Sequence, residues 1–227
     1  MKRSLTASNG HISHGNQHLL RVGHFEAHSE AITLLRGPNG CGKSSLVRAL
    51  HDPDFGRWSK IVLTERDGQD GTNCCSPNGK LVVLPQKHRV FSELTVVDNI
   101  AVSCAVSQRE AVKILYGSLL QPLTARMRVR AGDLCKGEQL RLGLAPLMYF
   151  ADSSRTPKCL AVLDEPLSGC SHELKSEVLN LLRRLVELNW CVIVAEQENV
   201  AVDGIAVEEW NFDHEGERTW TLNNGVR

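Results

Sequence analysis

One short stretch limits the folds open to this chain more than any other, the segment ITLLRGPNGCGKSSLVRAL at residues 32–50. An apolar run leads into a glycine-rich turn and then a helical pattern, and the turn fits the spacing G-x-x-x-x-G-K-S. Glycines let backbone N–H groups surround a chain of phosphates, the lysine reaches the terminal phosphates, and the serine hydroxyl can ligate Mg²⁺. The stretch therefore predicts a nucleotide phosphate loop between a strand and a helix. Its candidate binding residues are Gly37, Pro38, Asn39, Gly40, Cys41, Gly42, Lys43, Ser44 and Ser45.

A second segment, CLAVLDEP at residues 159–166, supplies the acids that a phosphate site requires. Its apolar residues predict a buried strand that ends at Asp164, where a carboxylate can hold Mg²⁺ through water opposite Ser44. The next residue, Glu165, is placed to polarise an attacking water. Together with the phosphate loop, these two acids predict a site for nucleotide binding and hydrolysis.

Strand and helix patterns alternate along the rest of the chain. Strands are expected at residues 18–27, 31–37, 59–68, 80–86, 159–166 and 191–197, and helices at residues 43–50, 96–107, 108–120, 137–150 and 173–188. The polar segment at residues 67–79 is predicted to be a loop, and residues 208–225 a pair of strands around a turn. This order predicts an α/β fold with a parallel sheet, helices on its faces and a helical insert between Gln86 and Cys159.

Composition excludes some classes of partner. The 227 residues carry 26 Lys plus Arg against 26 Asp plus Glu, so no global basic field favours nucleic acid or anionic lipid, and no nucleic-acid partner is expected. The N-terminal segment lacks the apolar core of a signal peptide and no window approaches the roughly 20 apolar residues of a membrane span, so a cytosolic location is expected. The eight cysteines form no CxxC pair and are expected to be reduced thiols.

Four motifs in order make the sequence resemble the nucleotide-binding subunit of ABC transporters over nearly its whole length. The phosphate loop is similar to that family's Walker A motif, and LAVLDEP to its Walker B motif with the catalytic glutamate at Glu165. LPQKHRVFSELTVVDNI is similar to the Q-loop region, which implies that Gln86 senses the γ-phosphate and the metal. LCKGEQLRLGLA is similar to the signature segment, usually L-S-G-G-[EQ]-Q, which meets the ATP held by a second subunit. The signature positions here are Cys135, Lys136, Gly137, Glu138 and Gln139.

The resemblance implies a P-loop NTPase α/β fold with a mostly parallel core sheet flanked by helices, an N-terminal antiparallel β subdomain and an inserted α-helical subdomain. The chain, 1–227, is expected to be a single ABC-type ATP-binding domain. Its RecA-like core is expected at approximately 1–86 and 158–227, and its helical subdomain at approximately 87–157. ATP and Mg²⁺ are the implied cofactors, and the implied metal-holding residues are Ser44, Gln86 and Asp164.

Five positions depart from the family pattern. Cys135 stands where a serine normally donates a hydroxyl to the γ-phosphate, and a thiol is a weaker donor. Lys136 stands at a glycine position, where a side chain clashes if the backbone requires positive φ. Ser171 replaces an aspartate that helps the subunits communicate, and Gln197 replaces the switch histidine with an uncharged donor. His14 lies near the position of the adenine-stacking aromatic, where stacking and an ordinary surface role are both open.

The resemblance favours an ATPase subunit on the cytoplasmic face of a membrane, working with integral membrane permease subunits that contact the surface around Val90 to Ile100. The altered signature favours a different second cassette, hence a heterodimer over a homodimer. Two alternatives stay open: a regulatory or structural cassette with little or no hydrolysis, and a soluble, non-transport ABC ATPase. For Cys41 a reactive thiol at a helix N-terminus and a tolerated small residue are both open.

Overall fold

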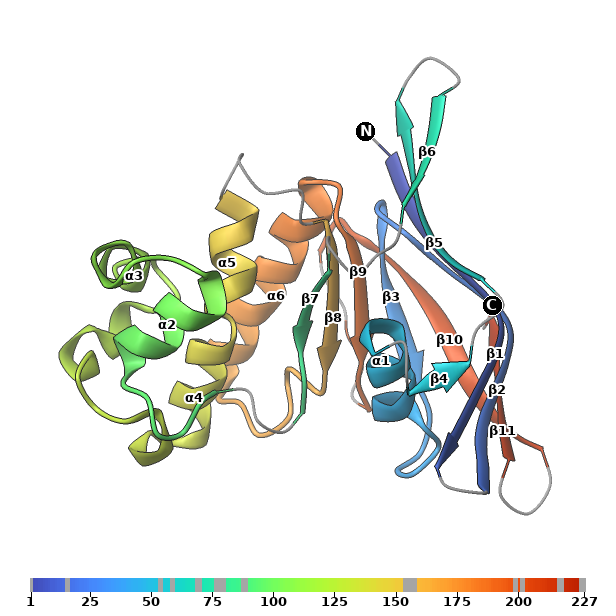
Figure 1. Cartoon of the computed structure of the whole chain (residues 1–227), viewed down its shortest axis with the longest axis horizontal. Coiled ribbons are helices and arrows are strands. Elements are labelled where there is room, and N and C mark those ends of the chain that lie inside the picture. The colour runs from blue at the N-terminus through green and yellow to red at the C-terminus, as the bar shows by residue number, and fades with distance from the viewer. Residues whose placement is uncertain are drawn as a thin grey trace.

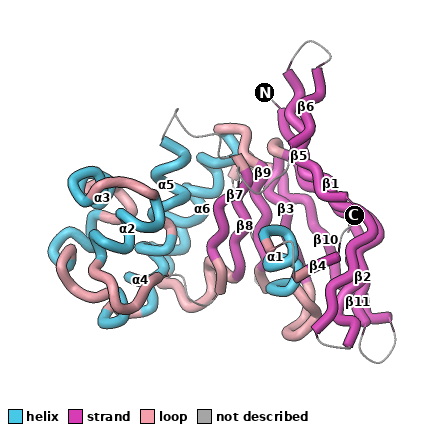
Figure 2. The backbone as a smooth tube through the Cα atoms, viewed as in Figure 1, coloured by secondary structure: helices cyan, strands magenta, loops and turns pink. Residues whose placement is uncertain are grey.

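The structure is a computed structural model that describes residues 2–14, 17–52, 55–57, 60–67, 71–75, 81–86, 90–152, 159–197, 200, 203–215 and 219–224. These residues form one eleven-stranded sheet in the order β6-β5-β1-β2-β11-β10-β3-β9-β8-β7, with β4 paired to β1. The strands are β1 (Lys2–His14), β2 (Gln17–His28), β3 (Ala31–Arg36), β4 (Gly56–Arg57), β5 (Lys60–Asp67), β6 (Gly71–Cys75), β7 (Leu81–Leu84), β8 (Leu160–Asp164), β9 (Cys191–Ala195), β10 (Ala206–Glu215) and β11 (Thr219–Asn224). Most helices lie beyond the β7 end of the sheet, opposite the antiparallel strands (Figures 1 and 2).

The strands β10, β3, β9, β8 and β7 run parallel and form the core of the sheet. Every residue of β8 and β9 is buried, as expected for strands covered on both faces. Successive residues of β8 belong to different core clusters: Leu160 lies in the cluster that contains α1 (Lys43–His51), and Ala161 in the cluster that contains α6 (His172–Glu187). The predicted α/β fold with a mostly parallel core sheet flanked by helices is confirmed.

The antiparallel region is built on β1, which pairs with β2 on one side and with β5 on the other. β1 is a strand that the sequence pattern does not indicate, because its apolar residues Leu5, Ala7 and Ile12 are widely spaced among serines, threonine and basic residues. The prediction of a loop at residues 67–79 was also wrong in part, since residues 71–75 form β6. Backbone pairing with β5 overrides the weak strand preference of this polar, glycine-containing segment.

The helices between β7 and β8 form a second packed region. They are α2 (Val96–Cys104), α3 (Gln108–Leu115), α4 (Lys136–Gly143) and α5 (Ala145–Asp152), with 3₁₀ turns at Gln121–Arg126 and Ala131–Asp133. The hydroxyls of Thr95 and Ser107 accept N-capping bonds for α2 and α3, so each helix begins one residue later. Among the described helices, none offers an apolar stretch of the length that a bilayer crossing requires.

The prediction of one helix at residues 137–150 was wrong, because α4 ends at Gly143 and α5 begins at Ala145. Pro146 falls in the first turn of α5, where its missing N–H is tolerated, whereas in the middle of a longer helix it would break the hydrogen-bond ladder. The helix expected at residues 96–107 likewise ends early, at Cys104, because Ala105 adopts a left-handed conformation with φ 54°.

Candidate functional site

Four loops meet at the carboxyl edge of the parallel strands, where α/β sheets bind their ligands. The phosphate loop follows β3, and Asp164 and Glu165 stand at the end of β8. Gln197 follows β9, and Gln86 follows β7. Since the strands are neighbours in the order β3-β9-β8-β7, residues far apart in the sequence converge on one edge.

The phosphate loop ends at the N-terminus of α1, which begins at Lys43. Gly42 has φ 105°, a left-handed conformation that a side chain disfavours. A Cβ atom at Gly37 would stand 2.6 Å from the Cys41 sulfur and 2.9 Å from Cβ of Phe212, so close packing also requires glycine there. The loop can therefore present its backbone N–H groups to a phosphate chain in the manner that the sequence predicts.

Lys43 is enclosed by the loop from which it starts. Its side chain is 5% exposed, and its ammonium donates to the carbonyl of Gly37 at 2.6 Å and to that of Pro38 at 3.1 Å. An anionic phosphate oxygen is a stronger acceptor than these neutral carbonyls. The cation is thus held within the phosphate loop by two backbone carbonyls.

Cys41 lies under the same loop and is 1% exposed. Burial raises the pKa of its thiol, and the charge of Lys43 opposes this shift only in part. A buried thiol with a raised pKa is a poor nucleophile at neutral pH, so its environment favours the packing role over the reactive one. All six cysteines whose side chains the structure describes are free thiols.

The carboxylate of Glu165 lies between two glutamine side chains. The amide of Gln86 donates to its Oε2 at 2.6 Å, and the amide of Gln197 donates to its Oε1 at 3.1 Å. The same Gln197 nitrogen also donates to Oδ1 of Asn39 in the phosphate loop at 2.6 Å. The three predicted catalytic residues, Glu165, Gln86 and Gln197, are therefore brought together, and Gln197 ties them to the phosphate loop.

The backbone at Glu165 is itself unusual, with φ 48° in the left-handed region. Its N–H donates to the carbonyl of Ala195 in β9 at 2.8 Å, which fixes the peptide as the chain leaves β8. Asp164, one residue earlier, is 3% exposed. The two acids thus occupy different environments, one buried in the sheet and one turned toward the glutamines.

The family profile described as "ABC transporter" matches residues 4–168. The chain belongs to this family. As a member, it is an ATP-binding domain from a family of ATPases. The sulfate/thiosulfate import ATP-binding protein CysA of Mannheimia succiniciproducens is 27% identical over 200 residues, covering 83% of this chain and 53% of that protein. The spermidine/putrescine import ATP-binding protein PotA of Mesorhizobium japonicum is 30% identical over 161 residues, covering 69% of this chain and 42% of that protein.

The chain thus spans about half the length of the curated relatives it matches. Among solved structures, an ATP-binding subunit of an ABC transporter superposes with a TM-score of 0.71 at 15% identity, covering 91% of this chain and 85% of that one. At that identity the likeness shows the fold alone.

The donors available in this cassette suit Mg²⁺. The predicted metal residues offer the hydroxyl of Ser44, the amide oxygen of Gln86 and the carboxylate of Asp164, which are hard oxygen donors. Within the described residues no three His, Cys, Asp or Glu side chains gather as a metal-binding group.

The signature segment of the cassette begins α4 on the helical side of the molecule, apart from α1 (Figure 1). Cys135 is its N-cap with an extended backbone, and Lys136 is its first residue. Among the described residues, those with positive φ that are not glycine do not include Lys136. Its side chain therefore causes no left-handed backbone strain. Both side chains are exposed.

The remaining signature residues hold the start of α4 in place. Oε2 of Glu138 accepts from the backbone N–H of Cys135 at 3.0 Å, the return bond of a capping box. The amide of Gln139 donates to the carbonyls of Ala131 and Leu134 at 3.1 and 3.2 Å. A Cβ atom at Gly137 would stand 3.6 Å from Leu174 of α6, an ordinary contact.

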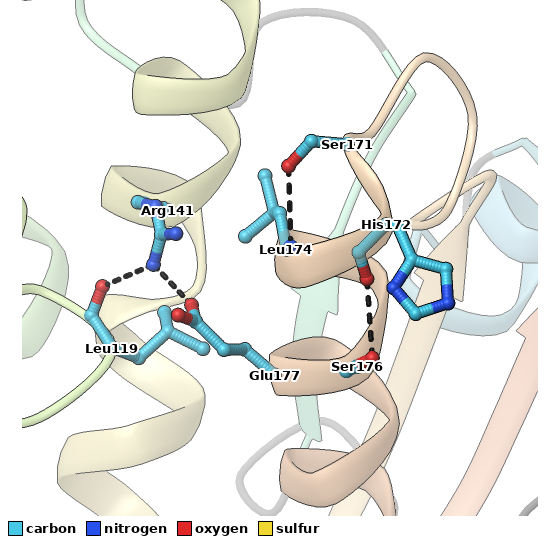
Figure 3. A network of polar contacts seen from close by, with 7 residues as sticks. All are labelled: Leu119, Arg141, Ser171, His172, Leu174, Ser176 and Glu177. Atoms are coloured by element: carbon cyan, nitrogen blue, oxygen red, sulfur yellow. Dashed lines mark hydrogen bonds and ion pairs between the residues drawn. The ribbon is translucent and has the colours of Figure 1, made fainter.

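Side-chain contacts between α4 and α6 add a link that the sequence did not indicate. Arg141 of α4 pairs with Glu177 of α6 and also donates to the carbonyl of Leu119 at 2.9 Å (Figure 3). Ser171 caps α6, its hydroxyl accepting from the N–H of Leu174 at 3.3 Å. The side chain of His14 falls outside the described residues, so its stacking role stays a prediction.

Proposed function

We propose that this chain is the ATP-hydrolysing cassette of a membrane transporter. The observation that carries the proposal is the carboxylate of Glu165, held by the amides of Gln86 and Gln197 and linked through Gln197 to the phosphate loop. The link to the phosphate loop supports a role for Glu165 as the general base of hydrolysis, acting on a water at the end of a bound phosphate chain. Both relatives, CysA and PotA, are named as import ATP-binding proteins, which supports the transport role.

In this proposal each residue has one task. Lys43 would neutralise the terminal phosphates, and Ser44, Asp164 and Gln86 would hold Mg²⁺. The ion supplies charge stabilisation to the phosphates when bound. Glu165 accepts a proton from the attacking water, while Gln197 donates to the developing charge as the switch histidine does in the family.

In the family, the signature residues of one subunit face the ATP that a second subunit holds. Cys135 and Lys136 are exposed at the start of α4, where a helix N-terminus would face an anion on another chain. The thiol is a weaker donor than a hydroxyl. A partner with a regular signature would therefore give the site of Lys43 and Glu165 its full set of donors, which favours a heterodimer.

Attachment to a permease on the cytoplasmic face is proposed through Phe91. Its backbone is fixed by the buried Asn99, which accepts from the Phe91 N–H at 2.7 Å and donates to its carbonyl at 3.0 Å. The phenyl ring is nevertheless 54% exposed. Val96 and Ile100 of the expected contact surface are instead fully buried in the core, because α2 turns its apolar face inward.

The decisive experiment isolates the protein from native membranes and measures ATP hydrolysis in the complex. Recovery with an integral membrane protein, and phosphate release that Glu165→Gln abolishes, are expected. Phe91→Glu should release the chain from the membrane, whereas Tyr116→Glu, at a ring that is 63% exposed, should not. Full recovery without a membrane partner would favour the non-transport alternative, and ATP binding without hydrolysis would favour the regulatory one.

A further inference from the structure

Among the residues that the structure describes, the proposed ATP chemistry gives no role to one buried carboxylate. Glu196 is 2% exposed and directly follows β9, whose residues Cys191–Ala195 are all buried. A carboxylate at that depth is stable only when hydrogen bonds replace the water it has lost. Its contacts therefore indicate which parts of the cassette it holds.

The two carboxylate oxygens of Glu196 contact two different segments. Oε2 accepts from the backbone N–H of Leu167 at 3.1 Å, and Oε1 accepts from the backbone N–H of Gln197 at 3.3 Å. The Glu196 N–H donates to the carbonyl of Leu35, at the entrance to the phosphate loop, at 3.3 Å. One residue thus touches the ends of β3 and β9 and the segment that follows β8.

The segment after β8 includes two left-handed residues, Glu165 with φ 48° and Gly169 with φ 69°, before α6 begins at His172. Within it, Ser168 and Cys170 make turn bonds at 3.4 and 3.3 Å, both to residues of the same segment. The bond from the Leu167 N–H to Glu196 instead ties the segment to the residue that follows β9 and precedes Gln197.

We propose that Glu196 is a positioning residue that couples the segment after β8, Glu165–Ser171, to the side chain of Gln197. One carboxylate shared by two backbone N–H groups fixes the distance between them, so a displacement of the segment moves the backbone that carries Gln197. Gln197 in turn holds Glu165 and Asn39. The inference rests on the proposed ATPase function for its kinetic consequence, but not for the contact itself.

The first test is kinetic and uses the full cassette with its partners. Glu196→Gln keeps the size of the side chain but places an N–H₂ group against one of the two backbone donors. We expect kcat for ATP hydrolysis to fall about 5- to 150-fold, the usual range for coupling between two sites, with KM for ATP within about twofold. Glu187→Gln, in an exposed pair with Arg183 on α6, is the matched control and should leave both constants unchanged.

A double-mutant cycle separates positioning from simple loss of structure. If Glu196 acts through Gln197, Glu196→Gln should reduce kcat much less in a Gln197→Ala background than in the wild-type chain. Equal reductions in both backgrounds would overturn the proposal.

Hydrogen exchange tests the contact without relying on activity. Glu196→Gln should accelerate exchange of the Leu167 and Gln197 amides, while Glu187→Gln should not. Unchanged protection at both amides would overturn the proposal even in an active enzyme. If the wild-type cassette proves inactive, the proposed hydrolysis fails, and the exchange measurement still decides the role of Glu196.

Discussion

The loops at the sheet edge and the start of α4 are organised in opposite ways. At the sheet edge, side chains from separate loops hold one another, as Gln197 does between Asn39 and Glu165, and Lys43 is almost fully buried. At the start of α4, Cys135 and Lys136 are exposed, and the bonds that fix the helix start are local. The first region is assembled within one chain, whereas in the proposed function the second is an exposed surface that acts against another chain.

The largest expected effect comes from replacing Glu165, the carboxylate at the sheet edge. Glu165→Gln keeps the side-chain volume but removes the proton acceptor, so ATP hydrolysis in the complex should fall about 10²- to 10⁴-fold. ATP binding should be retained, since Lys43 and the loop are untouched. Steady-state phosphate release and equilibrium ATP binding are the measurements, with Glu187→Gln as control. Activity that survives nearly intact would move the catalytic site to the partner cassette.

Removing the cation of the phosphate loop should act on binding instead. Lys43→Ala deletes the charge that meets the terminal phosphates, which should weaken MgATP by about 2–5 kcal/mol, or roughly 30- to 5,000-fold in Kd. Lys113→Ala, on the exposed side of α3, is the control. An unchanged Kd in the folded Lys43→Ala protein would contradict the whole nucleotide-site assignment.

The two regions also differ in how far the sequence alone describes them. The strand at β8 and the acids at its end were predictable, because a run of buried apolar residues ends abruptly in Asp164 and Glu165. The meeting of Gln86 with Glu165 was not readable from spacing, because it depends on the order of β7, β8 and β9 in the sheet. Only the family resemblance placed Gln86 there.

Glu196 was missed although a signal existed, since a lone charge directly after a buried strand calls for a partner. The link between Arg141 and Glu177 could not be foreseen, because it joins helices whose packing the sequence does not specify. The family has glycine at the position of Lys136, so a clash was expected if the backbone there required positive φ. The start of α4 has no positive φ, and the clash does not arise. The missed contacts, of Glu196 with Leu167 and of Arg141 with Glu177, both join elements that are far apart in the sequence.

A gain of function would sharpen the contrast between the regions. Cys135→Ser restores a hydroxyl donor at the exposed start of α4, and the chain on its own, paired with a second copy, should then hydrolyse ATP about tenfold faster. Cys135→Ala, of similar size but without a donor, is the matched control and should stay slow. A brisk wild-type homodimer, or an equal gain in both variants, would remove the argument for a different partner cassette.

The smallest effect concerns Ser171, the N-cap of α6, a helix that contacts β9 of the sheet and pairs through Glu177 with Arg141 of α4. Its hydroxyl caps α6 through the N–H of Leu174, so Ser171→Ala should destabilise the fold by about 1 kcal/mol and lower Tm by about 2–4 °C. Aspartate caps helices as well as serine does, so Ser171→Asp should leave Tm nearly unchanged while restoring the residue that the family uses between subunits. Thermal unfolding of the isolated chain measures the capping effect of each variant. Because Ser171→Asp should keep the cap, a change in its ATPase rate in the dimer would report the contact between subunits. If Ser171→Asp lowered Tm as much as Ser171→Ala does, Ser171 would not be a simple helix cap. The stability of the fold would then depend on residue 171 for more than the start of α6.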